Sequence, residues 1–232
     1  MSQFDEVTIG DCRLIHGDCR EVLPLLPKHD LLLTDPPYGI GAQNGIGKVT
    51  KAGSDFRNEA VADWDSAPPT AEVLNTARLL ADAQILWGGN YFELPPTPCL
   101  LIWDKVQPEK FSLAMAEVAW TSFKKPMKIW RWKSMSINCG DPKYHPTQKP
   151  VDLMSWCIGF APMAKSVLDP FMGSGTTGVA CAQLGKAFTG IERERKYFDI
   201  AFRRIEQAYA QQQLFKDANV GSGYPRVQES LL

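Results

Sequence analysis

The chain has 232 residues, of which 44% are hydrophobic and 22% are charged. A chain of this length can bury a substantial core in one domain, and this composition excludes wholesale disorder. The formal net charge is only −1, so any surface for a polyanion must come from local clustering of Lys and Arg rather than from global charge.

The cysteines and the hydropathy pattern bear on compartment and metal binding. The six cysteines are scattered without a C-x-x-C pair, which favours reduced thiols over a zinc ribbon or a redox dithiol and predicts no metal site. No basic segment followed by an apolar run opens the chain, and no stretch of about eighteen apolar residues occurs in it. We therefore expect a cytoplasmic protein.

Short apolar runs alternate with amphipathic segments along the chain. The runs predicted as strands are 13–16, 30–34, 84–88, 100–104, 117–122, 166–169 and 187–192. Helical spacing occurs at 21–26, 71–81, 151–160, 176–184 and 196–212. This alternation is typical of an α/β fold with a doubly wound, mostly parallel sheet, in which ligands bind at the carboxyl ends of the strands.

The tetrapeptide Asp35-Pro36-Pro37-Tyr38 directly follows the second predicted strand. Pro37 pushes Pro36 away from helical geometry, so the Pro36 carbonyl is presented rigidly. An aromatic amine is a weak nucleophile because its lone pair is delocalised into the ring. If Asp35 and the Pro36 carbonyl each accept one amine hydrogen, that lone pair can be aimed at an electrophilic methyl group, with Tyr38 stacked on a flipped base. The alternative is an ordinary strand-to-loop turn.

Two later segments lack a regular period. Residues 39–63 are rich in glycine and charge, and we predict a mobile loop there. Residues 124–144 form a basic segment with Trp130 and Trp132, which suits a target-recognition element that contacts nucleic acid. The alternation of apolar and basic residues at 127–132 is also typical of an edge strand. The predicted nucleic-acid-binding residues are Lys124, Lys125, Lys128, Arg131 and Lys133.

A glycine loop, 169–177, connects the strand at 166–169 to the helix at 176–184. Gly173 and Gly175 allow close approach of a ligand, and the helix N-terminus behind them favours a carboxylate. A triphosphate-binding loop needs a lysine after its last glycine, but Thr176 stands there, which argues against an ATPase. Glu192 ends the next strand, where a dinucleotide fold binds a ribose hydroxyl; the alternative is a solvated acid.

These residues together resemble the beta group of S-adenosylmethionine-dependent amino-methyltransferases of DNA, from about residue 10 to residue 210. The resemblance implies a Rossmann-like methyltransferase fold with one antiparallel strand and a circularly permuted motif order, because the tetrapeptide precedes the glycine loop. It also implies S-adenosylmethionine as cofactor. The implied catalytic residues are Asp35, Pro36 and Tyr38.

Two more segments look like motifs of that family. Gly17-Asp18-Cys19 contributes to the adenine pocket in relatives, although Asp18 could equally cap a helix. The segment 145–150, His145-Pro146-Thr147-Gln148-Lys149-Pro150, borders the methionine moiety in relatives. The resemblance thus implies these cofactor-binding residues: Asp18, Cys19, Asp35, His145, Thr147, Lys149, Asp169, Phe171, Gly173, Ser174, Gly175, Thr176 and Glu192.

An aspartate at the first position of the tetrapeptide favours adenine, because relatives that modify cytosine more often begin this motif with serine. We therefore expect a site-specific DNA methyltransferase that acts on N6 of a flipped adenine in double-stranded DNA. The alternatives are an N4-cytosine enzyme, an RNA methyltransferase and a catalytically silent nucleic-acid-binding module. The intact tetrapeptide argues against the silent module, and the motif order argues against RNA.

The expected organisation is one catalytic domain over residues 1–215 and a flexible tail over 216–232. A homodimer is expected because relatives commonly pair. The sequence from Gln211 to Phe215 looks like a short peptide that docks on the bacterial sliding clamp; its alternative is a fraying helix end.

Overall fold

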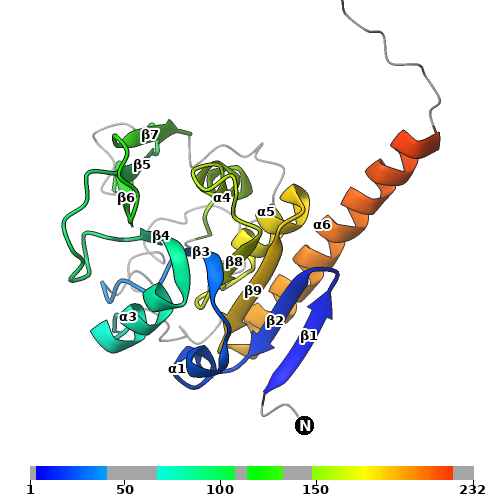
Figure 1. The fold of residues 1–232 in the computed structure, drawn as a ribbon, viewed down its shortest axis with the longest axis horizontal. Helices are drawn as coiled ribbons and strands as arrows, with labels where there is room; N and C mark the ends of the chain where they lie inside the picture. Colours follow the sequence, from blue (N-terminus) through cyan, green and yellow to red (C-terminus); the bar gives the residue numbers. More distant parts are fainter. Residues whose placement is uncertain (1–3, 41–66, 108–113, 133–147, 222–232) are drawn as a thin grey trace, which may run out of the picture.

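The computed structural model describes residues 4–40, 67–107, 114–132 and 148–221, and the side chains up to 213. A single mixed sheet forms the centre of the molecule, with strand order β1-β2-β9-β8-β3-β4-β6-β5-β7 (Figure 1). The strands are β1 (Asp5–Ile9), β2 (Cys12–His16), β3 (His29–Thr34), β4 (Ala81–Trp87), β5 (Leu100–Asp104), β6 (Ala116–Thr121), β7 (Lys128–Arg131), β8 (Ser166–Asp169) and β9 (Ala187–Glu192).

The helices lie between and after these strands. They are α1 (Cys19–Val22), the short 3₁₀ helix η1 (Leu23–Leu25), α3 (Ala71–Leu79), α4 (Val151–Ile158), α5 (Thr176–Leu184) and α6 (Arg195–Gly221). The long C-terminal helix α6 projects beyond the body of the molecule (Figure 1). Within the described ranges, no helix is both long and apolar enough to span a bilayer.

The mostly parallel sheet is confirmed, because β2, β9, β8, β3 and β4 pair in parallel. Strand β6 is antiparallel to both neighbours, β4 and β5. The prediction of one antiparallel strand was wrong, because the described part of the sheet has two: β6, and the edge strand β1, which is antiparallel to β2. The sequence did not reveal β1 because its side chains are mostly exposed and give no apolar run.

Both faces of the sheet are covered, as the apolar strands predict. In β3, Leu31 and Leu33 pack into a core with residues of α4, α5 and α6, whereas Leu32 faces the opposite core with residues of α1, η1 and α3. Adjacent residues of a strand point to opposite faces, so a strand buried on both sides carries no polar stripe. All three leucines are fully buried.

Several element boundaries differ from those predicted. The helix expected at 21–26 divides into α1 and η1, where Pro24 sits at the start of the 3₁₀ turn. The helix expected at 71–81 ends at Leu79, because Ala81 already begins β4. Helix α6 continues to Gly221, so it contains the Gln211 to Phe215 segment and extends past the domain boundary predicted at residue 215.

The strand order brings the two predicted loops together. Strands β3 and β8 are parallel neighbours, with Leu31 opposite Val167. The chain leaves β3 towards α3 and β4 on one side, and leaves β8 towards α5 and β9 on the other. Loops that diverge from adjacent strands in this way open a crevice at the carboxyl ends, where ligands bind in doubly wound sheets.

Candidate active site

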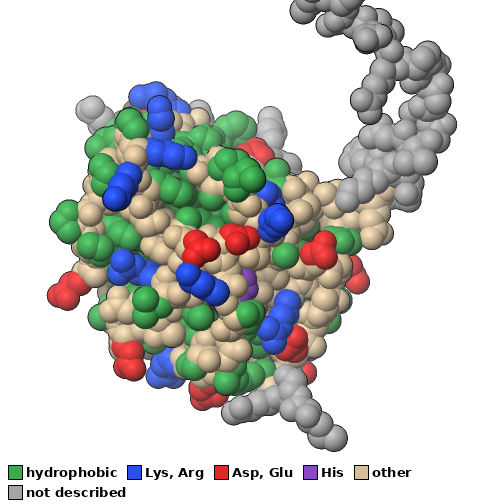
Figure 2. Space-filling view, viewed as in Figure 1, with side chains coloured by type: hydrophobic (Ala, Val, Ile, Leu, Met, Phe, Trp, Pro, Cys, Tyr) green, Lys and Arg blue, Asp and Glu red, His purple; other side chains and the backbone are tan. Residues whose placement is uncertain are grey.

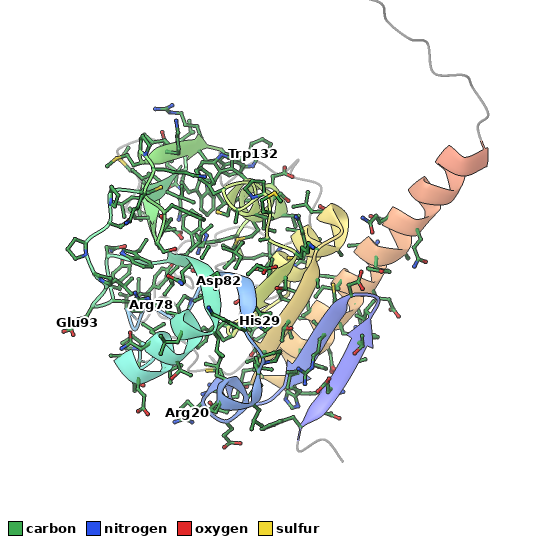
Figure 3. The ribbon with its side chains drawn as sticks, in the orientation of Figure 1. Arg20, His29, Arg78, Asp82, Glu93 and Trp132 are labelled. Carbon is green, nitrogen blue, oxygen red and sulfur yellow. The ribbon has the colours of Figure 1, made fainter. Side chains whose placement is uncertain are left out.

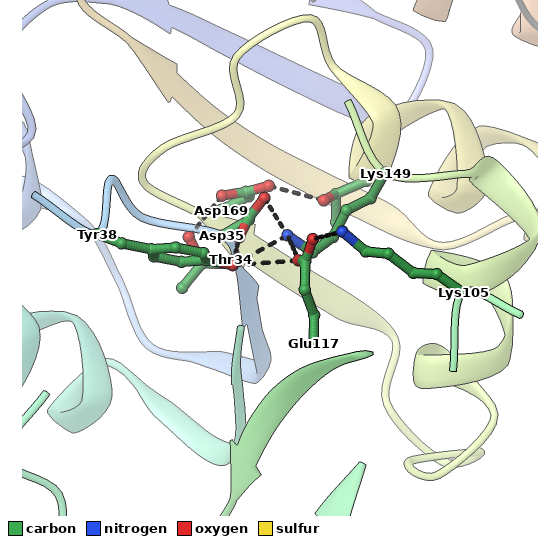
Figure 4. Close-up of polar contacts among 8 residues, drawn as sticks. Thr34, Asp35, Tyr38, Lys105, Glu117, Lys149 and Asp169 are labelled. Atoms are coloured by element: carbon green, nitrogen blue, oxygen red, sulfur yellow. Dashed lines mark hydrogen bonds and ion pairs between the residues drawn. The ribbon is translucent and has the colours of Figure 1, made fainter. Parts of the chain in front are cut away.

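The tetrapeptide at the end of β3 supplies a carboxylate and a phenol that contact each other. The Tyr38 hydroxyl donates a hydrogen bond to Asp35 Oδ1 at 2.6 Å. Lys149 forms an ion pair with Asp35 Oδ2 and donates to Tyr38 Oη at 3.1 Å (Figure 4). Pro36, the residue after Asp35, is buried. The structure therefore brings Asp35 and Tyr38 together as predicted, and adds Lys149.

Lys149 belongs to a charged network that crosses the end of the sheet. Its ammonium lies 3.1 Å from Glu117 Oε2, and Lys105 lies 2.5 Å from Glu117 Oε1. The Lys149 side chain is only 3% exposed. Two carboxylates and two ammonium groups thus alternate as Asp35, Lys149, Glu117 and Lys105, so the formal charge of the network sums to zero (Figure 4).

The network shifts the pKa values of its members. Burial raises the pKa of the Asp35 carboxyl, a rise that contact with Lys149 opposes. Burial acts in the same direction on Glu117, but Lys149 and Lys105 hold its pKa at about 2. Burial disfavours the charged form of Lys149, yet Asp35 and Glu117 raise its pKa above the ordinary value. Lys149 and Glu117 are therefore charged at neutral pH.

The aromatic ring of Tyr38 is held from several directions. It stacks on Tyr91 with ring centroids 4.9 Å apart and an angle of 18° between planes, and it meets Phe92 in an edge-to-face arrangement with ring centroids 6.3 Å apart. Gly88, which follows β4, has φ +72° and lies so close that a Cβ atom would sit 2.1 Å from Tyr38 Cε1. A residue with a side chain at position 88 would displace the Tyr38 ring, so this glycine shapes the site.

Asp169 ties the tetrapeptide strand to the glycine loop. Its carboxylate accepts hydrogen bonds from Thr34 Oγ1 and Thr177 Oγ1, both at 2.7 Å, and from the Phe171 N–H at 3.1 Å. Burial raises its pKa to about 6, although these hydrogen bonds oppose the rise. Asp169 is 2% exposed, so its contacts place it as a brace beneath the predicted cofactor site.

The glycine loop and Glu192 form the next part of the site. Glu192 accepts hydrogen bonds from the N–H groups of Gly173 at 2.9 Å and Glu194 at 2.8 Å. Burial nevertheless raises its pKa to about 7. Gly173 has φ +53°, and a Cβ atom there would meet nothing within 4 Å, so its outer side is open. This open backbone beside a carboxylate fits a ligand that carries hydroxyl groups.

A buried arginine supports the second half of the loop. Arg204 of α6 donates to the Ser174 carbonyl at 2.6 Å, to Ser174 Oγ at 3.1 Å and to Thr176 Oγ1 at 3.3 Å. Ser174 Oγ also donates to Gln148 Oε1 at 3.2 Å, which joins the loop to the segment before α4. Gly175 has φ +80° and packs against Ala201. Helix α6 therefore fixes the loop from behind.

The Gly17-Asp18-Cys19 segment lies beside Glu192, because β2 pairs with β9 and the Gly17 N–H donates to the Glu192 carbonyl at 3.0 Å. Asp18 caps α1 by accepting from the Arg20 N–H at 2.9 Å, so the capping alternative is confirmed. Burial raises the pKa of the Cys19 thiol to about 11. Both residues stand at the same edge of the sheet as the glycine loop.

The basic segment is divided by the limits of the described chain. Residues 128–131 form β7 at the edge of the sheet, which confirms the edge-strand alternative for this part. Lys and Arg side chains gather with hydrophobic ones at this end of the molecule (Figure 2), and Trp132 lies there, on the opposite side from Arg20 near α1 (Figure 3). Lys124, Lys125, Lys128 and Arg131 are all exposed, and Arg131 contacts Asp104 at 3.3 Å.

Some predicted residues lie outside the described part of the chain: His145, Thr147 and Lys133, together with most of the predicted mobile loop at 39–63. Among the residues that are described, no three His, Cys, Asp or Glu side chains gather as a metal site.

Five residues of the site were not predicted from the sequence: Glu117, Lys105, Gly88, Tyr91 and Arg204. Glu117 stands near the start of β6, and the start of this antiparallel strand lies at the same edge as the ends of its neighbours, β4 and β5. A prediction that β6 is antiparallel would therefore have placed Glu117 at the site. Lys105 directly follows β5, so the strand-end rule applies to it too.

The comparisons with known proteins agree with this geometry. The DNA methylase family model for N6 and N4 enzymes matches residues 101–203. The type II methyltransferase M.HinfI of Haemophilus influenzae is 27% identical over 84% of this chain and 68% of its own length. The type II methyltransferase M2.DpnII of Streptococcus pneumoniae is 48% identical over 27% of this chain and 24% of its own length. The predicted relationship to DNA amino-methyltransferases is confirmed.

Solved structures show the same fold. The complex of M1.HpyAVI with SAM has a TM-score of 0.53 at 22% identity, covering 84% of this chain and 98% of that one. The cytosine-N4-specific PvuII DNA methyltransferase has a TM-score of 0.54 at 14% identity, covering 88% of this chain and 93% of that one. The predicted methyltransferase fold is therefore confirmed, whereas the circular permutation stays a prediction.

The brace formed by Asp169 generates a stability prediction. The Asp169→Ala variant leaves the Thr34 and Thr177 hydroxyls and the Phe171 N–H without their acceptor, which should lower the free energy of unfolding by about 2–4 kcal/mol. Urea denaturation measures the loss. The matched control is Asp82→Ala, which removes an ion pair with Lys28. The Asp82 and Lys28 side chains are 65% and 61% exposed, so this substitution should cost less than about 1 kcal/mol. Equal losses in the two variants would contradict the brace.

Proposed function

We propose that this protein transfers a methyl group from S-adenosylmethionine to the exocyclic amine of a base flipped out of double-stranded DNA, with N6 of adenine as the preferred target. The proposal rests above all on one observation: Asp35 and Tyr38 at the end of β3 stand beside the glycine loop at the end of β8. An amine acceptor and a cofactor cradle thus share one crevice. The type II methyltransferase relatives support DNA as the substrate.

The residues along β8 and β9 fit the proposed cofactor. Glu192 would accept hydrogen bonds from the ribose hydroxyls, and the open side of Gly173 leaves room for the backbone to approach the ligand. Phe171, Ser174, Gly175 and Thr176 would line this cradle, with Asp18 and Cys19 at the adenine end. When bound, S-adenosylmethionine supplies a methyl group on a sulfonium, which is electrophilic without further activation.

Asp35 and the Pro36 carbonyl would orient the amine. Each accepts one amine hydrogen, so the nitrogen lone pair turns out of the ring plane towards the methyl group. A bond forms from nitrogen to the methyl carbon while the sulfur–carbon bond breaks and its electron pair stays on sulfur. The nitrogen then carries a positive charge and loses one proton to solvent. The Asp35 carboxylate stabilises that charge as it develops.

Adenine is proposed over cytosine because Asp35 occupies the first position of the tetrapeptide. The alternative, N4 of cytosine, presents the same amine beside a ring nitrogen, and the N4-specific PvuII enzyme has this fold. Nucleoside mass spectrometry of plasmid DNA incubated with the protein distinguishes N6-methyladenine from N4-methylcytosine. Duplex RNA of matched sequence tests RNA as an alternative substrate. Formation of N4-methylcytosine alone would replace the adenine assignment.

We further propose that the β7 edge contacts DNA. Exposed cations flank Trp130 and Trp132, whose rings stack at 5.5 Å, so phosphate neutralisation and an aromatic surface occur together. A homodimer would extend this surface, and S-adenosylmethionine chemistry on chromosomal DNA would place the protein in the cytoplasm. The Gln211 to Phe215 segment stays a proposal for a sliding-clamp contact.

The catalytic proposal predicts the behaviour of Asp35→Ala. This variant loses the carboxylate that accepts an amine hydrogen, so methyl transfer to DNA should fall by about a thousandfold or more. Binding of S-adenosylmethionine should change by less than about threefold, because the proposed cofactor cradle is built from the glycine loop, Glu192 and the Asp18-Cys19 segment. Single-turnover methylation and calorimetric titration measure the two quantities. Turnover that survives the substitution would contradict the mechanism.

The Glu192 carboxyl predicts a pH dependence of cofactor binding. Its pKa of about 7 means that the free protein is partly protonated at neutral pH, whereas hydroxyl donors require the carboxylate. Affinity for S-adenosylmethionine should therefore rise as pH increases, by about tenfold between pH 6 and pH 8. Calorimetry on Glu192→Gln provides the control, since it shares every other titrating group. A wild-type slope equal to that of Glu192→Gln would argue against this role.

The β7 proposal predicts the result of reversing two charges. The double variant Lys128→Glu/Arg131→Glu should bind duplex DNA at least about tenfold more weakly, with a smaller dependence on salt, while cofactor affinity is unchanged. Fluorescence anisotropy measures DNA binding. The control is Lys28→Glu/Lys165→Glu, which changes the charge equally at residues that precede the central strands β3 and β8. Unchanged DNA affinity in the β7 variant would refute the contact.

A further inference from the structure

We propose that Glu117 is a positioning residue that holds Lys149 when the base amine engages Asp35. This inference rests on the proposed function of the same site and deepens it. In the structure Lys149 is shared between two carboxylates, Asp35 on the β3 loop and Glu117 on β6. Methyl transfer requires only one of them to accept the amine, so the other is available for Lys149.

Both oxygens of the Asp35 carboxylate have partners in the observed arrangement. Oδ1 accepts from the Tyr38 hydroxyl at 2.6 Å, and Oδ2 contacts the Lys149 ammonium. An incoming amine hydrogen must therefore replace or share one of these donors. Lys149 is the partner with the closer second anion, because Glu117 Oε2 lies 3.1 Å from its ammonium and 3.5 Å from the Tyr38 hydroxyl.

Charge gives a reason for Lys149 to leave Asp35 during transfer. The amine nitrogen becomes positive as its bond to the methyl carbon forms, and a fixed ammonium group against the same carboxylate would oppose that charge. Lys149 cannot move to water at little cost, since its side chain is 3% exposed and an unpaired buried charge is strongly unfavourable. A shift towards Glu117 keeps Lys149 paired and frees Asp35 Oδ2.

The contacts and charge of Glu117 favour this shift of Lys149. Lys105 contacts its other oxygen at 2.5 Å, and the Tyr38 hydroxyl lies 3.5 Å from Oε2. The two lysines keep the Glu117 carboxyl ionised, with a pKa of about 2. Lys149 can also retain its hydrogen bond to Tyr38 Oη, which lies 3.1 Å away. Each buried polar group then keeps a partner after the amine binds.

Four titratable groups face Asp35 from the elements packed around it. Tyr38 lies on its own loop, Lys149 precedes α4, Glu117 belongs to β6 and Asp169 ends β8. The Glu117 carboxylate raises the pKa of Asp35, and Asp35 raises the pKa of Asp169, as like charges do. Lys149 lowers the pKa of Asp35. Removal of the Glu117 charge therefore has a defined sign: Asp35 becomes more acidic and more tightly paired with Lys149.

The first test measures Asp35 directly and does not depend on methyl transfer. Carbon-13 NMR titration of the Asp35 carboxyl is compared in the wild-type protein, in Glu117→Gln and in Glu206→Gln, which changes an exposed glutamate on α6. We expect the apparent pKa of Asp35 to fall by at least about one unit in Glu117→Gln and to be unchanged in Glu206→Gln. An Asp35 titration that is identical in all three proteins would overturn the inference.

The second test is a double-mutant cycle on single-turnover methylation. Glu117→Gln should transfer methyl at least about tenfold more slowly, with unchanged cofactor affinity, because Lys149 then stays on Asp35. The double variant Glu117→Gln/Lys149→Met removes the competing ammonium, so it should transfer faster than Glu117→Gln alone. Glu117→Asp, which keeps the charge, should retain more activity than Glu117→Gln and shows that loss of the carboxylate, not misfolding, causes the defect.

The outcomes separate the two proposals. A wild-type protein that methylates no DNA or RNA, but shows the expected Asp35 titration shift, would contradict the proposed function and leave the charge exchange supported. A wild-type protein that methylates DNA, while Glu117→Gln matches it in rate, would overturn the role of Glu117. Additive losses in the double-mutant cycle would also overturn it, since Lys149 would then act independently of Glu117.

Discussion

The hydrogen bonds of the buried Asp169 carboxylate fix the relation between the two halves of the site. Thr34 immediately precedes Asp35, and Thr177 stands in the first turn of α5, so one carboxylate fixes the end of β3 against the start of α5. Each contact is short, at 2.7 Å, and lies away from water. A methyl transfer needs its reacting atoms aligned to a fraction of an ångström, and a brace of this kind supplies that alignment from the core rather than from surface loops.

The charged network solves a different problem. A lone buried carboxylate such as Asp35 would be costly and would tend to protonate, and a lone buried lysine would tend to lose its proton. Alternation of Asp35, Lys149, Glu117 and Lys105 gives each of these groups an oppositely charged partner, without a net charge in the low-dielectric end of the sheet. Such a cluster contributes little to stability compared with apolar packing. Its consequence is that Asp35 and Lys149 each have more than one partner within reach.

Sequence patterns predicted the sheet and the two loops well because those features are local. An apolar run followed by Asp35-Pro36-Pro37-Tyr38, and another followed by a glycine loop, identify strand ends without knowledge of strand order. Gly88 and Tyr91 could not be assigned, since their role depends on where the Tyr38 ring lies after folding. Lys149 was assigned to the cofactor by resemblance, whereas its described ion pairs are with Asp35 and Glu117 and it donates a hydrogen bond to Tyr38.

Strand β5 connects the proposed DNA edge to the charged network. It pairs in parallel with β7, and its last residue, Asp104, contacts Arg131 at 3.3 Å. The next residue, Lys105, contacts Glu117. Arg131, which would bind a phosphate, therefore contacts the residue that directly precedes Lys105, the partner of Glu117. Residues on strands are held more precisely than residues on loops. The sheet itself therefore sets the position of the edge that would hold DNA relative to the charges that would activate the base.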